Sequence, residues 1–382
     1  MPNSAPLNAR PFAQWGMGFT RPLIIAGPCS AESLEQVLAT AHGIVQHAPQ
    51  VKVFRAGVWK PRTQPGHFEG AGNVALDWLK AVREETGLLP IVEVATAEHV
   101  EACLKAGIEL LWIGARTTPN PFSVQEIADA LRGLDVPVFV KNPINPDLHL
   151  WIGALERLGG AGLTRLAAVH RGFNWFERTA YRNSPMWEFP IRLKARFPDL
   201  ELVCDPSHIS GTTELIGEVA QQALDLNFSG LMIEAHRDPA HALSDAKQQL
   251  TPQRLGEVLR ELIVREQHPA QRSDRLLELR DLIDQLDEEI AQKMGSRMDI
   301  AERIGEWKAD HNVAILQPER WDRIMHRQLR LAQDLGLSGA FVEELMNAIH
   351  KESIRRQTEV LVAANTTPVG SPAAPGKVAQ GS

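Results

Sequence analysis

Four side chains in the sequence are of the types that bind a divalent metal ion. Cys29 follows the apolar run LIIAGP, His208 lies in DPSH, Glu234 ends GLMIE, and Asp245 lies in SDAKQQL. One thiolate, one imidazole and two carboxylates form a mixed ligand set that suits Mn²⁺, Fe²⁺, Co²⁺ or Zn²⁺. A lone buried cysteine is usually a packing residue. The three other potential ligands, which follow similar apolar runs, favour a ligand role for Cys29.

A second group of side chains is cationic and follows the same kind of apolar run. Surface lysines and arginines are normally solvated, but cations directly beyond buried segments need anionic partners. Guanidinium groups match the oxygen pairs of phosphate and carboxylate. The pattern predicts a site for more than one phosphate, or for a phosphate and a carboxylate. The cations are Arg55, Lys60, Arg62, Arg116, Lys141 and Arg171, and the candidates for proton transfer are Lys141 and His170.

Eight apolar, β-branched runs alternate with amphipathic stretches between residues 20 and 265. Nearly continuous apolar runs are typical of parallel strands buried on both faces. Eight βα units in this length predict a closed (β/α)₈ TIM barrel, an α/β fold whose active site lies at the C-terminal strand ends. No Gly-x-Gly-x-x-Gly follows the first run, which disfavours a dinucleotide site. The expected strands are 23–27, 51–56, 89–95, 110–115, 136–142, 166–171, 200–205 and 230–236.

The composition disfavours several classes of partner. The 382 residues carry a formal net charge of −7, so we expect no nucleic acid partner. Three cysteines without paired spacing are typical of a reducing compartment, which predicts a cytoplasmic protein. We expect no signal peptide and no membrane partner, because no basic start precedes an apolar stretch and no apolar run reaches the roughly 20 residues that span a bilayer.

The chain changes character after residue 265. Residues 274–363 contain one proline, Pro318, and no strand-like alternation, which predicts an all-α domain of three helices. The first helix is too long for an ordinary globular helix and suggests a bundle or an intertwined dimer. The expected helices are 273–309, 318–335 and 339–363. The expected segments are an extension (1–19), the barrel (20–265), a linker (266–272), the helical domain (273–364) and a disordered tail (365–382).

Polar residues interrupt the apolar faces of these helices. The seam of the first helix runs from Ile283 through Ile290 to Ile304, and on or beside it lie Arg280, Arg297 and Lys308. Ser353 and Gln357 share one face of the last helix. Polar groups on a buried side need partners, although arginines can also extend from the edge of a seam to water.

The motifs of the barrel, taken together and in this order, identify a resemblance. AGPCSAES, KPRT, IGART, HRG, DPSH and SDAKQQL closely resemble the type I-beta 3-deoxy-D-arabino-heptulosonate 7-phosphate (DAHP) synthases over about residues 20–260. The resemblance implies condensation of phosphoenolpyruvate with erythrose 4-phosphate, the first step of the shikimate pathway. It implies a divalent cofactor, most simply Mn²⁺, on Cys29, His208, Glu234 and Asp245. Phosphoenolpyruvate would bind Arg55, Arg116, Lys141 and Arg171, and the aldose phosphate would bind Lys60, Pro61, Arg62 and Thr63.

The helical region is similar to the all-helical class of chorismate mutases. LLELRDLIDQLDEEI, RMDIAERIGEWKAD, LQPER and ESIRRQ carry the resemblance over about residues 273–360. It implies rearrangement of chorismate to prephenate in a homodimer, with an arginine reaching the partner's site. Trp321 departs from the family, which often has a glutamate for the substrate hydroxyl there. By this resemblance, chorismate would bind Arg280, Arg297, Lys308, Arg320, Ser353 and Gln357, with Lys308 and Gln357 at the ether oxygen.

Three alternatives remain open from the sequence. The helices could be a dimerisation and sensing module that binds chorismate or prephenate without turning it over. The barrel could act on arabinose 5-phosphate like an octulosonate 8-phosphate synthase, although the motif of that family, Lys-Ala-Asn-Arg-Ser, is replaced here by KPRTQP. The barrel could also bind phosphorylated ligands without catalysis. The fusion itself predicts feedback on the barrel by a ligand of the helical domain.

Overall fold

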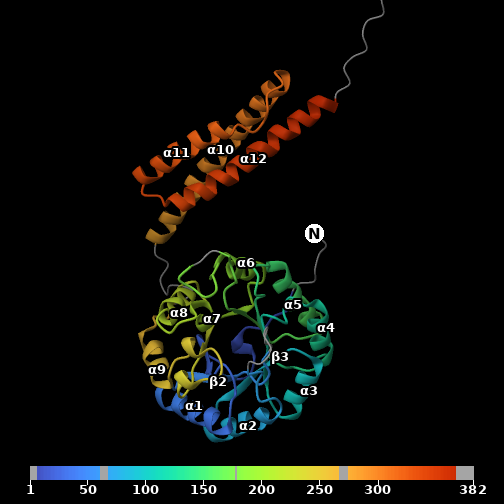
Figure 1. Ribbon diagram of the computed structural model, residues 1–382, viewed down its shortest axis with the longest axis vertical. Helices are drawn as coiled ribbons and strands as arrows, with labels where there is room; N and C mark the ends of the chain where they lie inside the picture. The colour runs from blue at the N-terminus through green and yellow to red at the C-terminus, as the bar shows by residue number, and fades with distance from the viewer. Residues whose placement is uncertain (1–6, 61–67, 177–178, 266–273, 367–382) are drawn as a thin grey trace, which may run out of the picture. The chain divides into compact units, whose positions relative to one another are not determined.

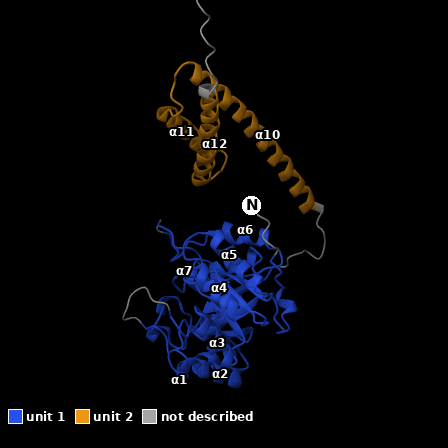
Figure 2. Ribbon diagram, turned by 90° about the vertical axis from the view of Figure 1, so that its right-hand side faces the viewer, with its two compact units in different colours: residues 1–267 blue, residues 268–382 orange. Residues whose placement is uncertain are grey.

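The computed structural model describes residues 7–60, 68–176, 179–265 and 274–366. It divides the chain into two compact units, residues 1–267 and 268–382, which Figure 2 shows in different colours. We call them the barrel unit and the helical unit. The expected linker (266–272) and all of the expected tail beyond residue 366 lie outside the described residues.

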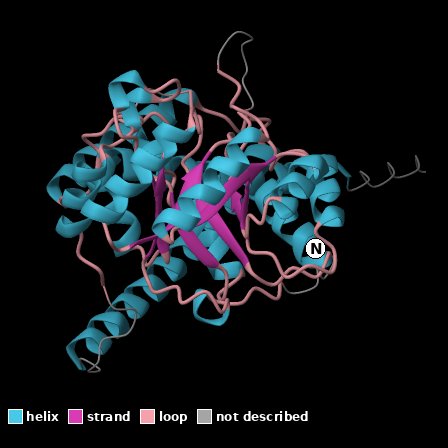
Figure 3. Ribbon diagram, turned by 90° about the horizontal axis from the view of Figure 1, so that it is seen from below, coloured by secondary structure: helices cyan, strands magenta, loops and turns pink. Residues whose placement is uncertain are grey.

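The barrel unit contains the predicted closed sheet of eight parallel strands, in the order β1 to β8. The first and last strands pair with each other, and Gly27 lies opposite Glu234. Figure 3 shows the strands enclosed by helices. The strands are β1 (Leu23–Gly27), β2 (Val51–Ala56), β3 (Leu89–Val94), β4 (Leu110–Ile113), β5 (Val138–Lys141), β6 (Leu166–His170), β7 (Glu201–Cys204) and β8 (Gly230–Glu234).

Helices follow the strands and cover the outside of the barrel (Figure 1). Several begin at a side chain that accepts a hydrogen bond from a free backbone N–H of the first turn, as Ser33, Thr96 and Asp147 do. The helices are α1 (Leu34–His47), α2 (Val74–Thr86), α3 (Ala97–Lys105), α4 (Pro121–Ala130), α5 (Leu148–Gly160), α6 (Glu188–Arg196), α7 (Pro206–Ser210), α8 (Ile216–Asp225) and α9 (Pro252–Glu261).

The barrel is closed at one end by residues that we expected to be an extension. Phe12, Trp15 and Phe19 are buried in one cluster with strand residues such as Ile25 and Phe139. The ring of Trp15 lies 5.5 Å from the ring of Phe139, centroid to centroid. The segment from residue 12 onward therefore forms an aromatic floor of the barrel.

The opposite end of the barrel is formed by the C-terminal ends of the strands. The alternation of side chains along each strand determines which residues point inward there. Side chains in a strand alternate between its two faces, so the residue two beyond an inward apolar residue also points inward. Val53, Trp112 and Val169 belong to the inner cluster. Applied to every strand, the same period gives the inward residues at the C-terminal ends, which are Gly27, Arg55, Glu93, Gly114, Lys141, Arg171, Asp205 and Glu234.

The helical unit contains the three predicted helices. They are α10 (Asp274–Asp310), α11 (Pro318–Asp334) and α12 (Gly339–Thr366), and α10 packs along α12. A small core forms around Ala332, Val342 and Met346. The first half of α10 leaves its large apolar side chains exposed, namely Leu276, Leu277, Leu279, Leu282, Ile283, Leu286 and Ile290.

Candidate active sites

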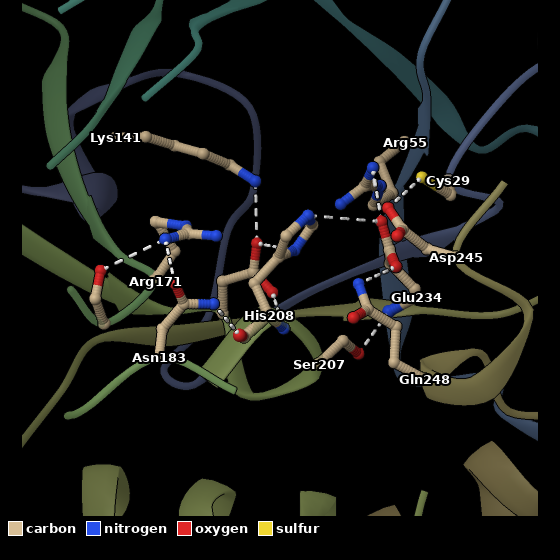
Figure 4. A network of polar contacts seen from close by, with 12 residues as sticks. Cys29, Arg55, Lys141, Arg171, Asn183, Ser207, His208, Glu234, Asp245 and Gln248 are labelled. Atoms are coloured by element: carbon tan, nitrogen blue, oxygen red, sulfur yellow. Dashed lines mark hydrogen bonds and ion pairs between the residues drawn. The ribbon is translucent and has the colours of Figure 1, made fainter. Parts of the chain in front are cut away.

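Three of the four predicted metal ligands lie together at the C-terminal end of the barrel. The ligand atoms of Cys29, Glu234 and Asp245 all lie within 4.8 Å of one another. Cys29 follows β1, Glu234 ends β8, and Asp245 lies in the loop after β8. Figure 4 shows the three side chains converging. A buried thiol between two carboxylates is a poor packing arrangement and a good donor set for a cation.

The fourth predicted ligand, His208, lies beside this cluster but outside its tightest group. Its Nε2 is 3.8 Å from Glu234 Oε1, and its Nδ1 is 2.8 Å from Asp205 Oδ2. Burial, above all, lowers the pKa of His208, which keeps the imidazole neutral. A carboxylate behind one ring nitrogen orients the other nitrogen toward a metal in many metal sites. This contact leaves Nε2 of His208 on the side of Glu234.

Two cations lie against the cluster. Arg55 Nη2 is 3.0 Å from Glu234 Oε1, and Lys60 Nζ is 3.1 Å from Cys29 Sγ. Burial and the charge of Glu234 raise the pKa of the Cys29 thiol to about 12, although Lys60 opposes this rise. Arg55, a predicted phosphoenolpyruvate residue, is instead ion-paired with Glu234 of the cluster, and its Nε and Nη1 have no hydrogen-bond partner among the described residues.

A cavity of about 390 Å³ opens beside the cluster and is strongly cationic. Its wall includes Asp245 and His208 as well as Glu93. Of the predicted phosphoenolpyruvate residues, Arg116, Lys141 and Arg171 line it. Of the predicted aldose phosphate residues, Lys60 lines it, while Pro61, Arg62 and Thr63 lie outside the described residues. The cations on the wall are Lys60, Arg116, Lys141, Arg171 and Arg182.

Buried polar groups hold two of these cations in place. Lys141 Nζ lies 2.7 Å from Asp205 Oδ2, and Arg171 Nη1 donates to Asn183 Oδ1 at 2.7 Å. Burial, assisted by the charges of Arg182 and Arg116, lowers the pKa of Arg171 to about 10. Arg171 therefore keeps its charge at neutral pH, and Nη1 donates to the neutral acceptors Asn183 Oδ1 and the Gly172 carbonyl, which suits an anionic ligand.

His170 does not reach this cavity, and its predicted role in proton transfer needs correction. Val169 faces the inside of the barrel, so its neighbour His170 faces the helices. The ring packs near Trp151 and Trp187, and Nε2 donates to the Pro185 carbonyl at 2.6 Å. Burial lowers the pKa of His170 to about 3. A neutral, fully buried imidazole on the outer face of a strand is a packing residue.

Sequence reasoning missed Arg182, Asn183 and Gln248. Arg182 and Asn183 lie in the long connection between β6 and α6, and both line the cavity. Gln248 is buried and donates to Glu234. The available signal was the length of the connection after β6, because loops at this end of a barrel carry functional residues. Gln248 lies within SDAKQQL, of which only Asp245 was considered.

The helical unit brings four predicted chorismate residues into two pairs between α10 and α12. Arg297 Nη1 donates to Ser353 Oγ at 2.5 Å, and Lys308 Nζ donates to Gln357 Oε1 at 3.1 Å. Burial lowers the pKa of Lys308. Arg297 also ends a groove of about 310 Å³ that runs along α10 from Leu286. Two cations with polar partners are suited to a dianionic ligand.

The two other predicted chorismate residues are exposed. Arg280 precedes Arg297 by roughly 25 Å along the same straight helix, at 1.5 Å per residue. Arg320 lies in the first turn of α11. Its neighbour Trp321 stacks on His350, with ring centroids 3.9 Å apart. Burial, with smaller contributions from the charges of Arg297 and Lys308, lowers the pKa of His350.

Comparison with known proteins agrees with this geometry. The model of the DAHP synthetase I family matches residues 14–268, a range that includes all eight strands of the barrel. The chain belongs to the DAHP synthetase I family. A chorismate mutase type II model matches residues 279–358, in the helical unit. The chain thus condenses phosphoenolpyruvate with erythrose 4-phosphate and rearranges chorismate to prephenate.

Individual relatives divide between the two units. A phospho-2-dehydro-3-deoxyheptonate aldolase of Thermotoga maritima is 29% identical over 239 residues, covering 63% of this chain and 68% of the relative. The crystal structure of the Thermotoga maritima DAHP synthase superposes with a TM-score of 0.56 at 28% identity, covering 63% of this chain and 67% of that one. A 4-amino-4-deoxychorismate mutase of Streptomyces pristinaespiralis is 35% identical over 104 residues, covering 27% of this chain and 80% of the relative.

These matches bear on the alternatives. The match to the DAHP synthetase I family makes the octulosonate synthase alternative the weaker one. The mutase match favours catalysis over sensing alone, as do the contacts of Arg297 with Ser353 and of Lys308 with Gln357. Within the part of the chain that the structure describes, no helix has the length and apolar character to cross a membrane.

Proposed function

We propose that the barrel is a metal-dependent synthase whose ion is bound by Cys29, His208, Glu234 and Asp245. The observation that carries the proposal is the convergence of a thiol and two carboxylates beside a cationic cavity. Buried Glu234 Oε1 lies 3.0 Å from Arg55 Nη2 and 3.8 Å from His208 Nε2, so the carboxylate faces the imidazole that would share the ion. The mixed thiolate, imidazole and carboxylate donors suit a divalent first-row ion, and we take Mn²⁺ as the proposed ion, with Co²⁺, Fe²⁺ and Zn²⁺ as alternatives. The bound ion would act as a Lewis acid on the aldehyde carbonyl of the sugar.

The residues of the chain then hold two mutually repelling anions side by side. Arg116, Lys141 and Arg171 are proposed to bind the phosphate and carboxylate of phosphoenolpyruvate, with Arg55 below them. Lys60, with Pro61, Arg62 and Thr63, is proposed to bind the phosphate of erythrose 4-phosphate. Holding the two substrates together converts a bimolecular step into a step within one complex. The cations also stabilise the negative charges of the substrates, more strongly than they would in a site filled with water.

The proposed reaction forms one carbon–carbon bond and breaks one carbon–oxygen bond. The methylene carbon of phosphoenolpyruvate attacks the aldehyde carbon, and the aldehyde oxygen gains a proton. Water adds to carbon 2, and its oxygen becomes the keto oxygen as phosphate leaves with its bridging oxygen. The two protons of this water balance the proton gained by the aldehyde oxygen and the proton taken by the departing phosphate. Lys141 is the proposed proton-transfer group, because it lines the cavity and Asp205 holds its ammonium at 2.7 Å. His170 is not proposed for this step.

In the helical unit, Arg297 and Arg280 are proposed to bind the two carboxylates of chorismate. Lys308 and Gln357 would face the ether oxygen, where negative charge grows during the rearrangement. Ser353 holds the Arg297 guanidinium, and Arg320 contributes from α11. The rearrangement needs no cofactor, because holding the reactive conformer and stabilising the developing charge supply the rate.

We also propose that the mutase acts as a homodimer through the helical unit. One straight helix cannot deliver both Arg280 and Arg297 to one chorismate, because they are roughly 25 Å apart along it. The exposed apolar side chains on the same half of α10 supply a surface that a second copy would cover. Arg280 would thus enter the site of the partner.

A cytoplasmic location completes the proposal. Cys29 is a free cysteine, and a thiol that binds a metal must stay reduced. A reducing compartment provides this condition.

Titration with Mn²⁺ tests the metal site directly. We expect one tight site per chain, measured as the loss of the free Mn²⁺ signal in electron paramagnetic resonance. The Asp245→Ala variant should lack this site, while Asp77→Ala, on α2, should keep it. Turnover of both barrel substrates by a chain that binds none of Mn²⁺, Co²⁺, Fe²⁺ or Zn²⁺ would refute the metal role.

Complementation between two inactive variants tests the dimer. Arg280→Ala and Lys308→Met would each lose mutase activity, because each removes one group from every site. If Arg280 acts in the partner's site, a mixed dimer contains one intact site and one doubly altered site. Co-refolding equal amounts should therefore restore roughly a quarter of wild-type activity per chain, since about half of the dimers are mixed and each has one of two sites intact. Mixing without recovery would place Arg280 outside the partner's site.

A further inference from the structure

Arg182 connects the cavity wall to two of the proposed metal ligands. Its Nη1 donates to Asp245 Oδ1 at 3.0 Å and to Gln248 Oε1 at 2.6 Å. Gln248 in turn donates from Nε2 to Glu234 Oε2 at 2.7 Å, a contact that Figure 4 shows. One guanidinium therefore contacts one carboxylate directly and a second carboxylate through an amide.

The amide of Gln248 has a defined orientation because its oxygen faces a hydrogen-bond donor and its nitrogen faces an acceptor. The arginine is only a donor, so the amide oxygen must face it. The amide nitrogen then faces Glu234 Oε2, and a reversed amide would place its oxygen against the carboxylate. Gln248 is 1% exposed, so water does not compete for these contacts. This contact engages Oε2 of Glu234, so that Oε1 faces Arg55 and His208.

Asp245 has an uncommon backbone conformation. Its backbone has φ 47° and ψ 38°, in the left-handed region that residues other than glycine rarely adopt. Such a conformation persists where neighbouring contacts hold it. Arg182 is 3.0 Å from one carboxylate oxygen, and the Cys29 thiol is 3.2 Å from the other.

The backbone of Arg182 is anchored to the end of α7. Its N–H donates to the Ser210 carbonyl, and the next N–H, of Asn183, donates to Ile209. Gly211 permits the close approach, because a Cβ there would lie 2.4 Å from Cβ of Arg182. Since α7 also carries His208, one short element sets both a proposed ligand and the arginine that orients two others.

We propose that Arg182 and Gln248 are positioning residues that orient Asp245 and Glu234 for the metal ion. The inference rests on the proposed metal site and goes beyond it, because neither residue is a ligand. Removing a group that orients metal ligands weakens metal binding by roughly tenfold to a hundredfold in metalloenzymes. The effect should fall on metal affinity while leaving the fold of the barrel unchanged.

The experiment compares Arg182→Gln and Gln248→Met with a matched control. Arg83→Gln removes a surface arginine that also makes one ion pair, Arg83 to Glu109 at 3.0 Å, at similar exposure. For each full-length variant, the Mn²⁺ dissociation constant is measured by electron paramagnetic resonance, together with the melting temperature and the mutase rate. We expect a tenfold to hundredfold rise in the dissociation constant for Arg182→Gln and Gln248→Met only. Melting temperature without metal and mutase rate should match wild type.

The double variant and Arg182→Lys separate positioning from simple loss of charge. If the two residues act in series on Glu234, the double variant should lose less affinity than the product of the single losses. Arg182→Lys keeps a donor and a charge, so it should recover part of the affinity. Wild-type Mn²⁺ affinity in both single variants, or losses explained by a lower melting temperature, would overturn the inference. Absence of Mn²⁺ binding in the wild-type chain would instead overturn the metal site itself, and the inference with it.

Discussion

Cys29→Ala should reduce the rate of phosphoenolpyruvate consumption with erythrose 4-phosphate by at least about a thousandfold. The substitution removes the sulfur from the cluster with Glu234 and Asp245. Polarisation of a carbonyl by a metal ion supplies several kcal/mol, and a loss of about 4 kcal/mol corresponds to that factor. The assay follows phosphoenolpyruvate absorbance with saturating Mn²⁺. Treatment of the wild-type chain with EDTA should have the same effect, and added Mn²⁺ should reverse it.

Two controls make this result specific. Cys103→Ala removes an equally buried thiol on α3 that belongs to no cluster of potential metal ligands among the described residues, and it should keep synthase activity. The mutase in the same chain reports whether the protein is otherwise intact, because its proposed site contains no metal ligand. Synthase turnover that survives both EDTA and Cys29→Ala would show that Cys29 is a packing residue.

Lys308→Met should slow the conversion of chorismate to prephenate by roughly a hundredfold to a thousandfold, the range for losing one donor to a developing oxyanion. Methionine keeps the length of the side chain and removes the charge that Gln357 orients at 3.1 Å. The assay follows loss of chorismate absorbance. Lys351→Met removes an exposed lysine of α12 and should leave the rate unchanged. An unchanged rate in Lys308→Met would remove this residue from the mechanism.

The lowered pKa of Lys308 predicts how mutase activity declines at high pH. Burial lowers the pKa of Lys308 from the ordinary value of 10.5, so its charge is lost at a lower pH than usual. The charged form is the active one, and kcat/KM, which reports the free enzyme, should therefore fall as pH rises through this lowered pKa. The residual activity of Lys308→Met should lack this decline. A wild-type rate that stays flat to pH 10.5 would contradict the role of the ammonium charge.

The sequence predicted the barrel and most of the residues at the C-terminal ends of its strands, which we call the mouth of the barrel. Both depend on periodic patterns. Apolar runs identified the strands, and the residues at their C-terminal ends included Lys141, Arg171 and Glu234. The error at His170 came from taking two neighbours at a strand end together, although a strand can point only one of them inward. Counting from Val169 would have chosen Arg171 alone.

The rest of the site lies in segments without a period. Arg182 reaches Asp245 because its loop bonds to the end of α7, a contact between segments that are far apart in the sequence. Trp321 was recognised as a departure from the mutase pattern, but its partner His350 lies on another helix, and only packing brings them together. No local rule connects such pairs.

The aromatic floor has a consequence for how the barrel can evolve. The mouth buries several like charges and unpaired donors, which oppose folding, as expected where function and stability conflict. The floor, with Phe12, Trp15 and Phe19, contributes apolar burial far from any substrate. Because the two ends are separate, mutations at the substrate end can change specificity while apolar burial at the floor maintains the stability of the fold. Substitutions at the mouth should therefore be tolerated less well when Phe12, Trp15 or Phe19 is replaced.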